Sequence, residues 1–201
     1  MPSASWTHGS DNATWHARGM TEISDRYRRL SDAFASTVAG VPDDAWANPS
    51  PCDKWTARDV VRHVVDTQGM FLGFIGGELG PIPGVDDKPG AAWDAARIKV
   101  QAALADPRQA GAAFDGFFGR TTFAAAVDRF LNIDLVIHRW DLARATGQDD
   151  TLDPTDAERV LTNAREFGDA FRSPGVCGPE VPVPPDADLQ TSVLAFYGRA
   201  T

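Results

Sequence analysis

The first long hydrophobic pattern in this sequence lies between residues 21 and 39. Its apolar positions recur at spacings of three and four residues, which is the period of one face of an α-helix. These positions are Ile23, Tyr27, Leu30, Phe34 and Val38. A glycine and then a proline follow, and both residue types commonly end helices. The pattern therefore predicts an amphipathic helix from Thr21 to about Ala39.

Similar patterns predict the other long helices. Thr56 is suited to be a helix N-cap, because a threonine side chain accepts a hydrogen bond from the first turn, and the apolar stripe that follows it fades at Gly73. A further helical stretch covers residues 90–105. The clearest helix runs from about Thr122 to Ala145, where Gly147 is well placed as the C-terminal stop.

The C-terminal part combines a helix, an extended segment and a shorter helix. Asp153-Pro154 introduces the last long helix, a proline-rich strap follows at residues 178–185, and a short helix ends near Tyr197. Residues 107–119 show no clear pattern, and we assign no element there. No strand-period pattern of useful length occurs in the sequence, so the expected fold class is all-α, a helical bundle.

The chain has 201 residues, of which 43% are hydrophobic. This length fits one domain with a sizeable core. Residues 1–19 are polar and show no sustained periodicity, so we expect a disordered N-terminal extension there and a single domain over residues 20–201. No apolar run approaches the length of a membrane span and no secretory segment opens the chain, so we expect a cytoplasmic protein without a membrane partner.

The formal net charge is −9. Nucleic-acid binding requires clustered basic residues, and here the arginines are scattered among acidic residues. We therefore expect no nucleic-acid partner. The wide apolar faces of the predicted helices leave a homodimer open.

A carboxylate and an imidazole stand one helical turn apart in the sequence Asp134-Leu-Val-Ile-His138. Positions i and i+4 share one helix face, so both side chains can converge on one small object. His63 lies beside the apolar stripe of another predicted helix and supplies a second imidazole. Two imidazoles and a carboxylate suit zinc, with nickel, iron or manganese as alternatives, and three ligands leave a coordination position open. The other interpretation is an i, i+4 ion pair or hydrogen bond between Asp134 and His138.

Asp141 lies on the same predicted helix face as Asp134 and His138. It is a candidate further ligand, an acceptor that orients a histidine nitrogen, or a catalytic base. An ion pair with Arg144 or Arg62 is the alternative. Two tryptophans near the proposed ligands, Trp55 and Trp140, are candidates for substrate binding, and packing in the core is the alternative for both.

Other catalytic signatures are absent from the sequence. No G-x-S-x-G nucleophile motif and no Walker or Rossmann glycine loop occurs. The two cysteines, Cys52 and Cys177, lack C-x-x-C spacing and indicate neither a disulfide framework nor a thiolate zinc site. Cys52 is either a packed small residue or a reactive thiol ahead of a helix N-terminus.

Several segments resemble one protein family when they are taken in order. They are Trp46, Pro49-Ser-Pro-Cys-Asp-Lys-Trp55, Arg58-Asp-Val-Val-Arg-His-Val-Val65, Asp134-Leu-Val-Ile-His-Arg-Trp-Asp-Leu-Ala-Arg-Ala-Thr-Gly147, Gly178-Pro-Glu-Val-Pro-Val183 and Leu194-Ala-Phe-Tyr-Gly198. Together they resemble the DinB-like superfamily, and more closely its actinobacterial branch named for the metal-binding domain of mycothiol-dependent maleylpyruvate isomerase. The resemblance spans about residues 20–200.

The resemblance implies a four-helix bundle with a divalent metal, zinc before others, held between helices by His63, Asp134 and His138. It also implies use of mycothiol or another low-molecular-weight thiol, whose sulfur adds reversibly to an unsaturated diacid in the isomerase. Two departures limit the transfer. The isomerase carries a further C-terminal domain, whereas this chain has only a strap and a short helix there, and its acidic ligand is Glu where this chain has Asp134.

Together with the candidate ligands, the resemblance implies a metal-dependent, thiol-using isomerase or transferase that acts on a small molecule. Its open coordination position would take thiol, water or substrate. The alternative is a non-catalytic stress-response or interaction module that binds a metal or a small molecule.

Overall fold

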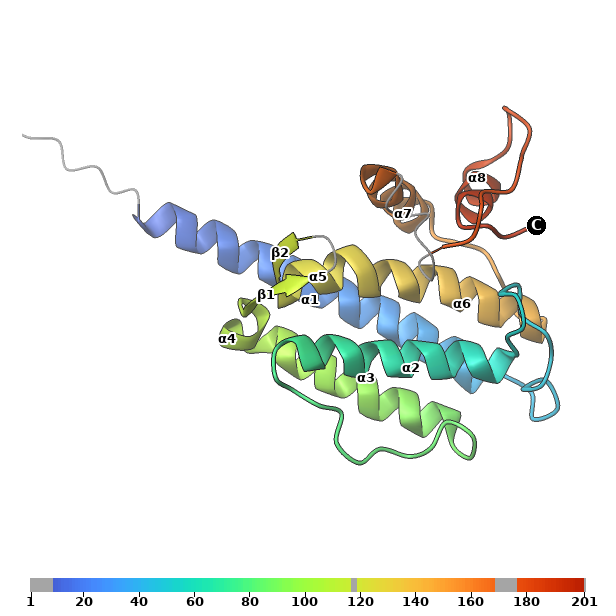
Figure 1. Ribbon diagram of the computed structural model, residues 1–201, viewed down its shortest axis with the longest axis horizontal. Helices are drawn as coiled ribbons and strands as arrows, with labels where there is room; N and C mark the ends of the chain where they lie inside the picture. The colour runs from blue at the N-terminus through green and yellow to red at the C-terminus, as the bar shows by residue number, and fades with distance from the viewer. Residues whose placement is uncertain (1–8, 117–118, 169–176, 201) are drawn as a thin grey trace, which may run out of the picture.

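The computed structural model describes residues 9–116, 119–168 and 177–200, with side chains described from residue 19 onward in the first helix. Long helices run roughly along one direction and form a bundle (Figure 1). They are α1 (Gly9–Ala39), α2 (Ala57–Phe74), α3 (Pro89–Ala105) and a last helix built from α5 (Phe123–Ala126), the π-helical turn η1 (Val127–Leu131) and α6 (Asn132–Thr146). The predicted all-α, DinB-like bundle is confirmed.

The four bundle helices contact one another in a ring. α1 packs against α3 and α6, and α2 packs against the same two helices. The connection between α2 and α3 runs back along the length of the bundle, so that these neighbouring helices point in the same direction (Figure 1). This crossover places α2 beside α6, although they lie far apart in the sequence.

A short helix and a β-hairpin connect α3 to the last bundle helix. A short helix, α4 (Pro107–Ala110), leads into an antiparallel hairpin of β1 (Ala113–Gly116) and β2 (Gly119–Thr122). The first strand lies in residues 107–119, to which the sequence analysis assigned no element, and the small hairpin leaves the all-α class unchanged. Each strand has only four residues, which is too short for a hydrophobic alternation to stand out.

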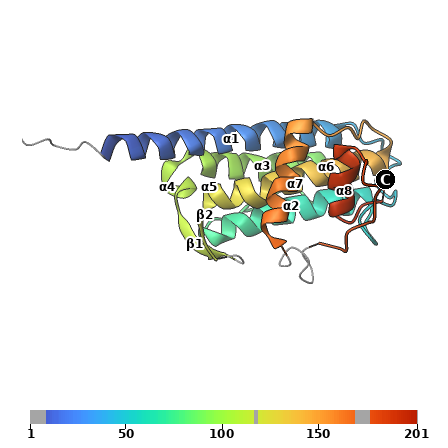
Figure 2. The same ribbon diagram turned by 90° about the horizontal axis from the view of Figure 1, so that it is seen from above.

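Two C-terminal helices lie beyond α6. α7 (Pro154–Glu166) crosses the direction of the bundle, and α8 (Leu189–Phe196) packs against α7 (Figure 2). The predicted strap precedes α8 and is tied to it by a hydrogen bond from Val181 N to Ala195 O at 3.0 Å. The strap and α8 therefore form one unit over the end of the bundle.

Helix boundaries follow the local signals in most places. The Thr56 side chain accepts from Asp59 N while the Asp59 carboxylate accepts from Thr56 N, which completes a capping box at the start of α2. Gly147 ends α6 in the left-handed region, with φ of 70°. Both predictions are confirmed.

The start of α1 differs from the prediction, since the helix begins at Gly9 rather than Thr21. Its first turns project beyond the other bundle helices (Figure 1). Residues 1–8 lie outside the described residues. The expectation that residues 1–19 form an extension separate from the domain stays a prediction.

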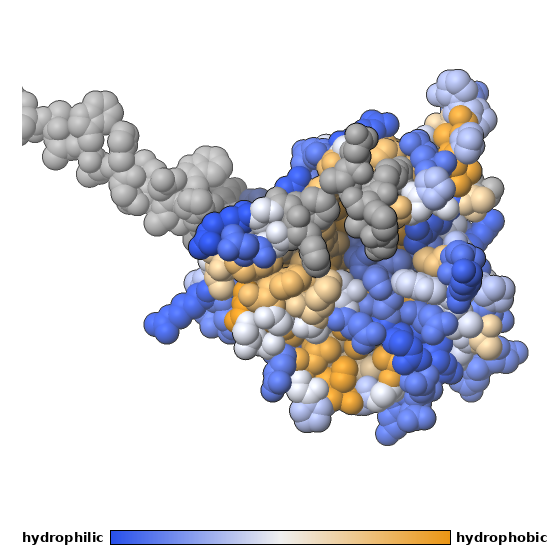
Figure 3. All heavy atoms as spheres, in the orientation of Figure 1, coloured by the Kyte–Doolittle hydropathy of each residue, from blue (hydrophilic) through white to orange (hydrophobic). Residues whose placement is uncertain are grey.

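The core fills the space between the bundle helices. Its largest fully buried side chains include Tyr27, Phe34, Trp93 and Trp140. The rings of Phe34 and Trp93 meet edge to face with centroids 5.0 Å apart, and the Tyr27 hydroxyl donates to Gln68 Oε1 at 2.7 Å. On the face seen in Figure 3, apolar residues gather in separate patches among hydrophilic ones. Within the described residues, no helix is both long and apolar enough to cross a bilayer.

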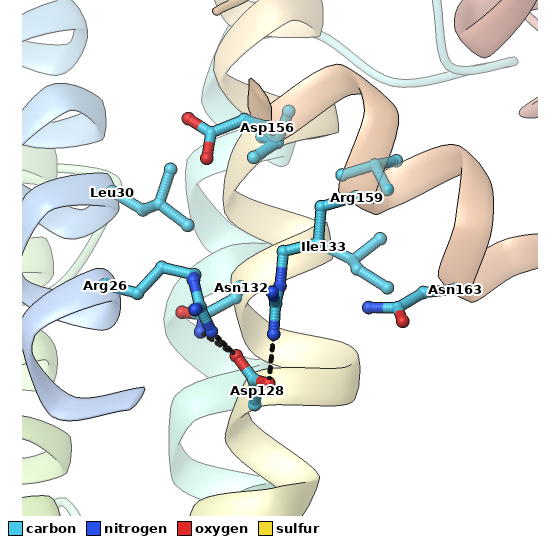
Figure 4. Close-up of a pocket in the computed structure, with 10 residues that line it drawn as sticks. Arg26, Leu30, Asp128, Asn132, Ile133, Asp156, Arg159 and Asn163 are labelled. Atoms are coloured by element: carbon cyan, nitrogen blue, oxygen red, sulfur yellow. Dashed lines mark hydrogen bonds and ion pairs between the residues drawn. The ribbon is translucent and has the colours of Figure 1, made fainter. Parts of the chain in front are cut away.

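A small cavity with charged and apolar residues in its lining lies between α1, α7 and the helix formed by η1 and α6 (Figure 4). The Asp128 carboxylate accepts from Arg26 on one side and, at 2.7 Å, from Arg159 Nη2 on the other. Asn132 Nδ2 donates to the same carboxylate at 3.1 Å, while Asn132 Oδ1 is buried without a hydrogen-bond partner among the described residues. The cavity measures about 10 Å³, which is room for one water. Through Asp128, these contacts connect η1 to α1 and α7. The helix α6, which carries Asp134 and His138, continues directly from η1.

Candidate metal centre

The structure brings the three predicted ligands together between α2 and α6. His63 Nε2 lies 3.2 Å from Asp134 Oδ2, and His138 Nε2 lies 3.3 Å from Asp134 Oδ1. One donor atom from each residue lies within 4.8 Å of the others, which is a spacing that can hold a metal ion. The side-by-side packing of α2 and α6 produces this convergence, since His63 comes from one helix and the other two residues from one face of the second.

An unsatisfied oxygen at this cluster fits a cation. Asp134 Oδ2 is buried and has no hydrogen-bond partner among the described residues, although His63 Nε2 is close. A buried carboxylate oxygen without a partner is costly, because it has lost its hydration. A divalent ion between this oxygen and the two imidazoles would remove that cost. The donor set of two nitrogens and one carboxylate is also one that zinc accepts.

Trp55 covers the two imidazole rings. Its ring centroid lies 4.9 Å from that of His63 and 5.9 Å from that of His138. The histidine rings themselves are 4.7 Å apart, edge to face. The loop ahead of α2 therefore supplies an aromatic wall beside the cluster, and the substrate-binding role of Trp55 stays a prediction.

Asp141 contacts the ring nitrogen of His138 that faces away from Asp134. Its carboxylate is 0% exposed, and Asp141 Oδ2 lies 2.9 Å from His138 Nδ1. Because Nδ1 is engaged there, Nε2 is the ring nitrogen that faces Asp134 and His63. This contact is the geometry that an orienting residue for His138 would have, and that role of Asp141, one of those predicted for it, stays a prediction.

The cation that pairs with Asp141 is Arg199, which the sequence analysis missed. Arg199 Nη2 and Nε donate to the two carboxylate oxygens at 2.7 and 3.0 Å. The predicted alternatives were wrong, since Arg144 pairs with Asp150 at 3.1 Å and Arg62 pairs with Asp86 at 2.6 Å. The only hint in the sequence was that Asp141, on a helix face expected to be buried, would need a cation. Arginines near it in the sequence are the wrong partners, and the actual partner lies in the residues that follow α8.

The pKa values of the clustered side chains are shifted by their mutual charges and hydrogen bonds. Burial alone would lower the pKa of His138, but the charge of Asp134 and the hydrogen bonds that the ring donates to both aspartates raise it well above its ordinary value. Burial alone would raise the pKa of Asp134, but His138 and then His63 hold it far below its usual range. The pKa of Asp141 is lowered to about 2 by its hydrogen bonds to His138 and Arg199, against the opposing effect of burial. Both carboxylates are therefore ionised at neutral pH.

Cys52 belongs to a second group of potential ligands, with His138 and Asp141. Cys52 Sγ lies 3.2 Å from Asp141 Oδ2 and 3.0 Å from Arg199 Nη2. The guanidinium therefore already supplies a positive charge to this second group. The thiol is half-buried, lines a cavity and contacts the polar side chains of Asp141 and Arg199.

A cavity of about 860 Å³ opens beside the cluster. Trp55, Cys52 and all three predicted ligands line it, as do Tyr197 and Arg199 from the C-terminal segment and several apolar side chains of α2 and the α5–α6 helix. Trp140 does not line it. Its side chain is 1% exposed and part of the core, so its position favours the packing alternative over substrate binding.

Comparison with known proteins agrees with this architecture. Residues 27–143 match the family model of the mycothiol maleylpyruvate isomerase N-terminal domain. The chain belongs to this family. Two proteins of Mycobacterium tuberculosis, from strains CDC 1551 / Oshkosh and ATCC 25618 / H37Rv, are each 33% identical over 175 residues, which cover 86% of this chain and 95% of theirs. Both are described as uncharacterized proteins, and no solved structure matches the chain.

The match to the isomerase N-terminal domain family contains the whole cluster except one residue. His63, Asp134, His138 and Asp141 all lie inside the matched segment, whereas Arg199 lies beyond it. The arginine behind Asp141 is therefore supplied by the part of the chain that follows the matched segment.

Proposed function

We propose that this protein is a divalent-metal-dependent enzyme that uses a low-molecular-weight thiol, of the mycothiol type, in an isomerase or transferase reaction. The observation that carries the proposal is the meeting of His63, Asp134 and His138 at the wall of a large cavity, with one buried carboxylate oxygen left unsatisfied. Membership of the isomerase N-terminal domain family supports the choice of reaction class.

The three ligands would hold the ion, with zinc as the first choice. A bound divalent ion would supply Lewis-acid chemistry, because it lowers the pKa of a coordinated thiol or water. The remaining groups would act around it. Asp141 keeps His138 in the orientation that presents Nε2, and Arg199 keeps Asp141 charged and in place. Trp55 shields the two imidazoles from solvent on one side.

The metal proposal is tested by the Asp134→Asn variant. The amide has nearly the same shape as the carboxylate but cannot supply its charge, so we expect about one equivalent of divalent ion in the native protein and at least a tenfold weaker affinity in the variant. Equilibrium dialysis followed by mass spectrometry of the metal measures both. Asp86→Asn is the matched control, because Asp86 pairs with Arg62 at the surface and should leave the affinity unchanged.

Catalysis is tested separately on metal-loaded protein. Thiol-dependent turnover across a panel of unsaturated and other electrophilic small molecules, lost in Asp134→Asn, would support the enzyme. A silent panel together with tight metal binding would contradict the catalytic part and favour the non-catalytic binding module. Equal metal content in the native protein and Asp134→Asn would contradict the metal site itself.

A further inference from the structure

The π-helical turn η1 lies directly ahead of Asp134 in the chain. Its defining hydrogen bond runs from Asn132 N to Val127 O, so it contains one residue more than an α-helical turn. In a regular α-helix, positions five apart point about 140° away from each other around the axis. The wider turn reduces this angle between Arg129 and Asp134 because it takes in the extra residue. Arg129 consequently lines the same cavity as Asp134.

The Arg129 guanidinium has hydrogen-bonding capacity to spare. Its Nε is buried and has no hydrogen-bond partner among the described residues. Its ion pair with Glu166 is long, at 3.8 Å, and both side chains are substantially exposed, at 43% and 59%. Such exposed pairs contribute little. Arg199, the other arginine at the cavity, differs because Asp141 and Tyr197 O already accept from it.

Aromatic rings hold Arg129 in position. The guanidinium carbon lies 4.3 Å from the centre of the Phe167 ring, and the Phe167 and Phe130 rings lie 5.3 Å apart. Stacking of this kind fixes the plane of a guanidinium while leaving its edge donors available. Phe130, Phe167 and Ile133 also line the cavity, so the apolar wall and the cation adjoin each other.

We propose that Arg129, Phe130 and Phe167 form an anion-binding subsite for a ligand with an acidic group on an aromatic or similarly flat apolar body. The acidic group accepts from Arg129, and the body lies against the two phenylalanines and extends toward Asp134. The step of five positions from Arg129 to Asp134 corresponds to about 7 Å along the helix axis, which is the scale of one substituted ring. This inference deepens the proposed function, because it concerns the ligand of the same cavity.

The test uses a pair of fluorescent probes that differ in charge. Anilinonaphthalene sulfonate carries an anion on an aromatic body, and N-phenyl-1-naphthylamine is its neutral counterpart. Titrations in the presence of a chelator follow binding without metal. We expect Arg129→Gln to weaken sulfonate binding about tenfold and to leave neutral binding unchanged, because only the former uses a charge-assisted hydrogen bond. Arg129→Lys, which keeps the charge but not the planar fork, should give an intermediate loss.

Arg120→Gln is the matched control, since Arg120 is an exposed arginine of β2 that does not line the cavity. Displacement of the bound sulfonate by benzoate or by phenyl phosphate then distinguishes a carboxylate ligand from a phosphate ligand. Equal weakening of both probes in Arg129→Gln would reduce Arg129 to a packing residue, and no change in either would also overturn the subsite. Because these titrations contain a chelator, they do not depend on the metal site. Failure of the subsite therefore says nothing about metal binding, and a protein that binds no metal can still bind the sulfonate at Arg129.

Discussion

At the scale of single residues, the centre depends on how His138 is held. One ring nitrogen faces Asp134 and the other contacts Asp141, which is fully buried and paired with Arg199. Sequence spacing predicted that Asp134, His138 and Asp141 share a helix face. It did not predict Arg199, because no local rule links a residue after α8 to one in α6. Trp140 shows the same limit, since helical spacing placed it near the ligands but tertiary packing buried it.

The Asp141–Arg199 pair gives a stability prediction at this scale. Arg199→Gln leaves the buried Asp141 carboxylate without its cation, so we expect a loss of about 3 kcal/mol in the free energy of unfolding. Urea denaturation measures it. The double variant Asp141→Asn with Arg199→Gln should regain much of that loss, because it removes the uncompensated charge. Additive losses in the double variant would show that the two side chains do not act as a pair.

At the scale of elements, sequence signals worked where they were local. The capping box at Thr56 and the left-handed Gly147 set the ends of α2 and α6 as predicted. The hairpin of β1 and β2 and the π-turn η1 gave no usable signal, because four-residue strands are too short for a pattern and a single extra residue in a helix barely disturbs its apolar period. The π-turn is nevertheless the element that turns Arg129 toward the cavity.

The cap of α2 can be tested directly. Thr56→Ala removes the side-chain acceptor for Asp59 N and half of the capping box, so we expect about 1 kcal/mol lower stability. Thermal or urea unfolding measures the change. Thr155→Ala, an exposed position in the first turn of α7, serves as the control and should change stability by less than about 0.5 kcal/mol. Equal effects at both positions would contradict the role of the cap.

At the scale of the whole molecule, the candidate ligands join two helices that the crossover makes neighbours. A metal held by α2 and α6 together would bind the folded bundle and not the unfolded chain, so it should stabilise the fold. We expect zinc at about one hundred times its dissociation constant to raise the free energy of unfolding by about 2.7 kcal/mol. Thermal unfolding with zinc or with a chelator measures this, and His63→Ala should abolish the difference. A zinc-dependent shift that persists in His63→Ala would place the ion elsewhere.

The two groups of potential ligands share His138 but differ in chemistry, since one contains Asp134 and His63 and the other contains Cys52 and Asp141. X-ray absorption spectroscopy of the zinc-loaded protein distinguishes them most directly. Coordination by nitrogen and oxygen alone at about 2.0–2.1 Å, with the multiple scattering of two imidazoles, is the predicted result. A sulfur shell at about 2.3 Å would contradict the account and move the metal to the Cys52 side of His138.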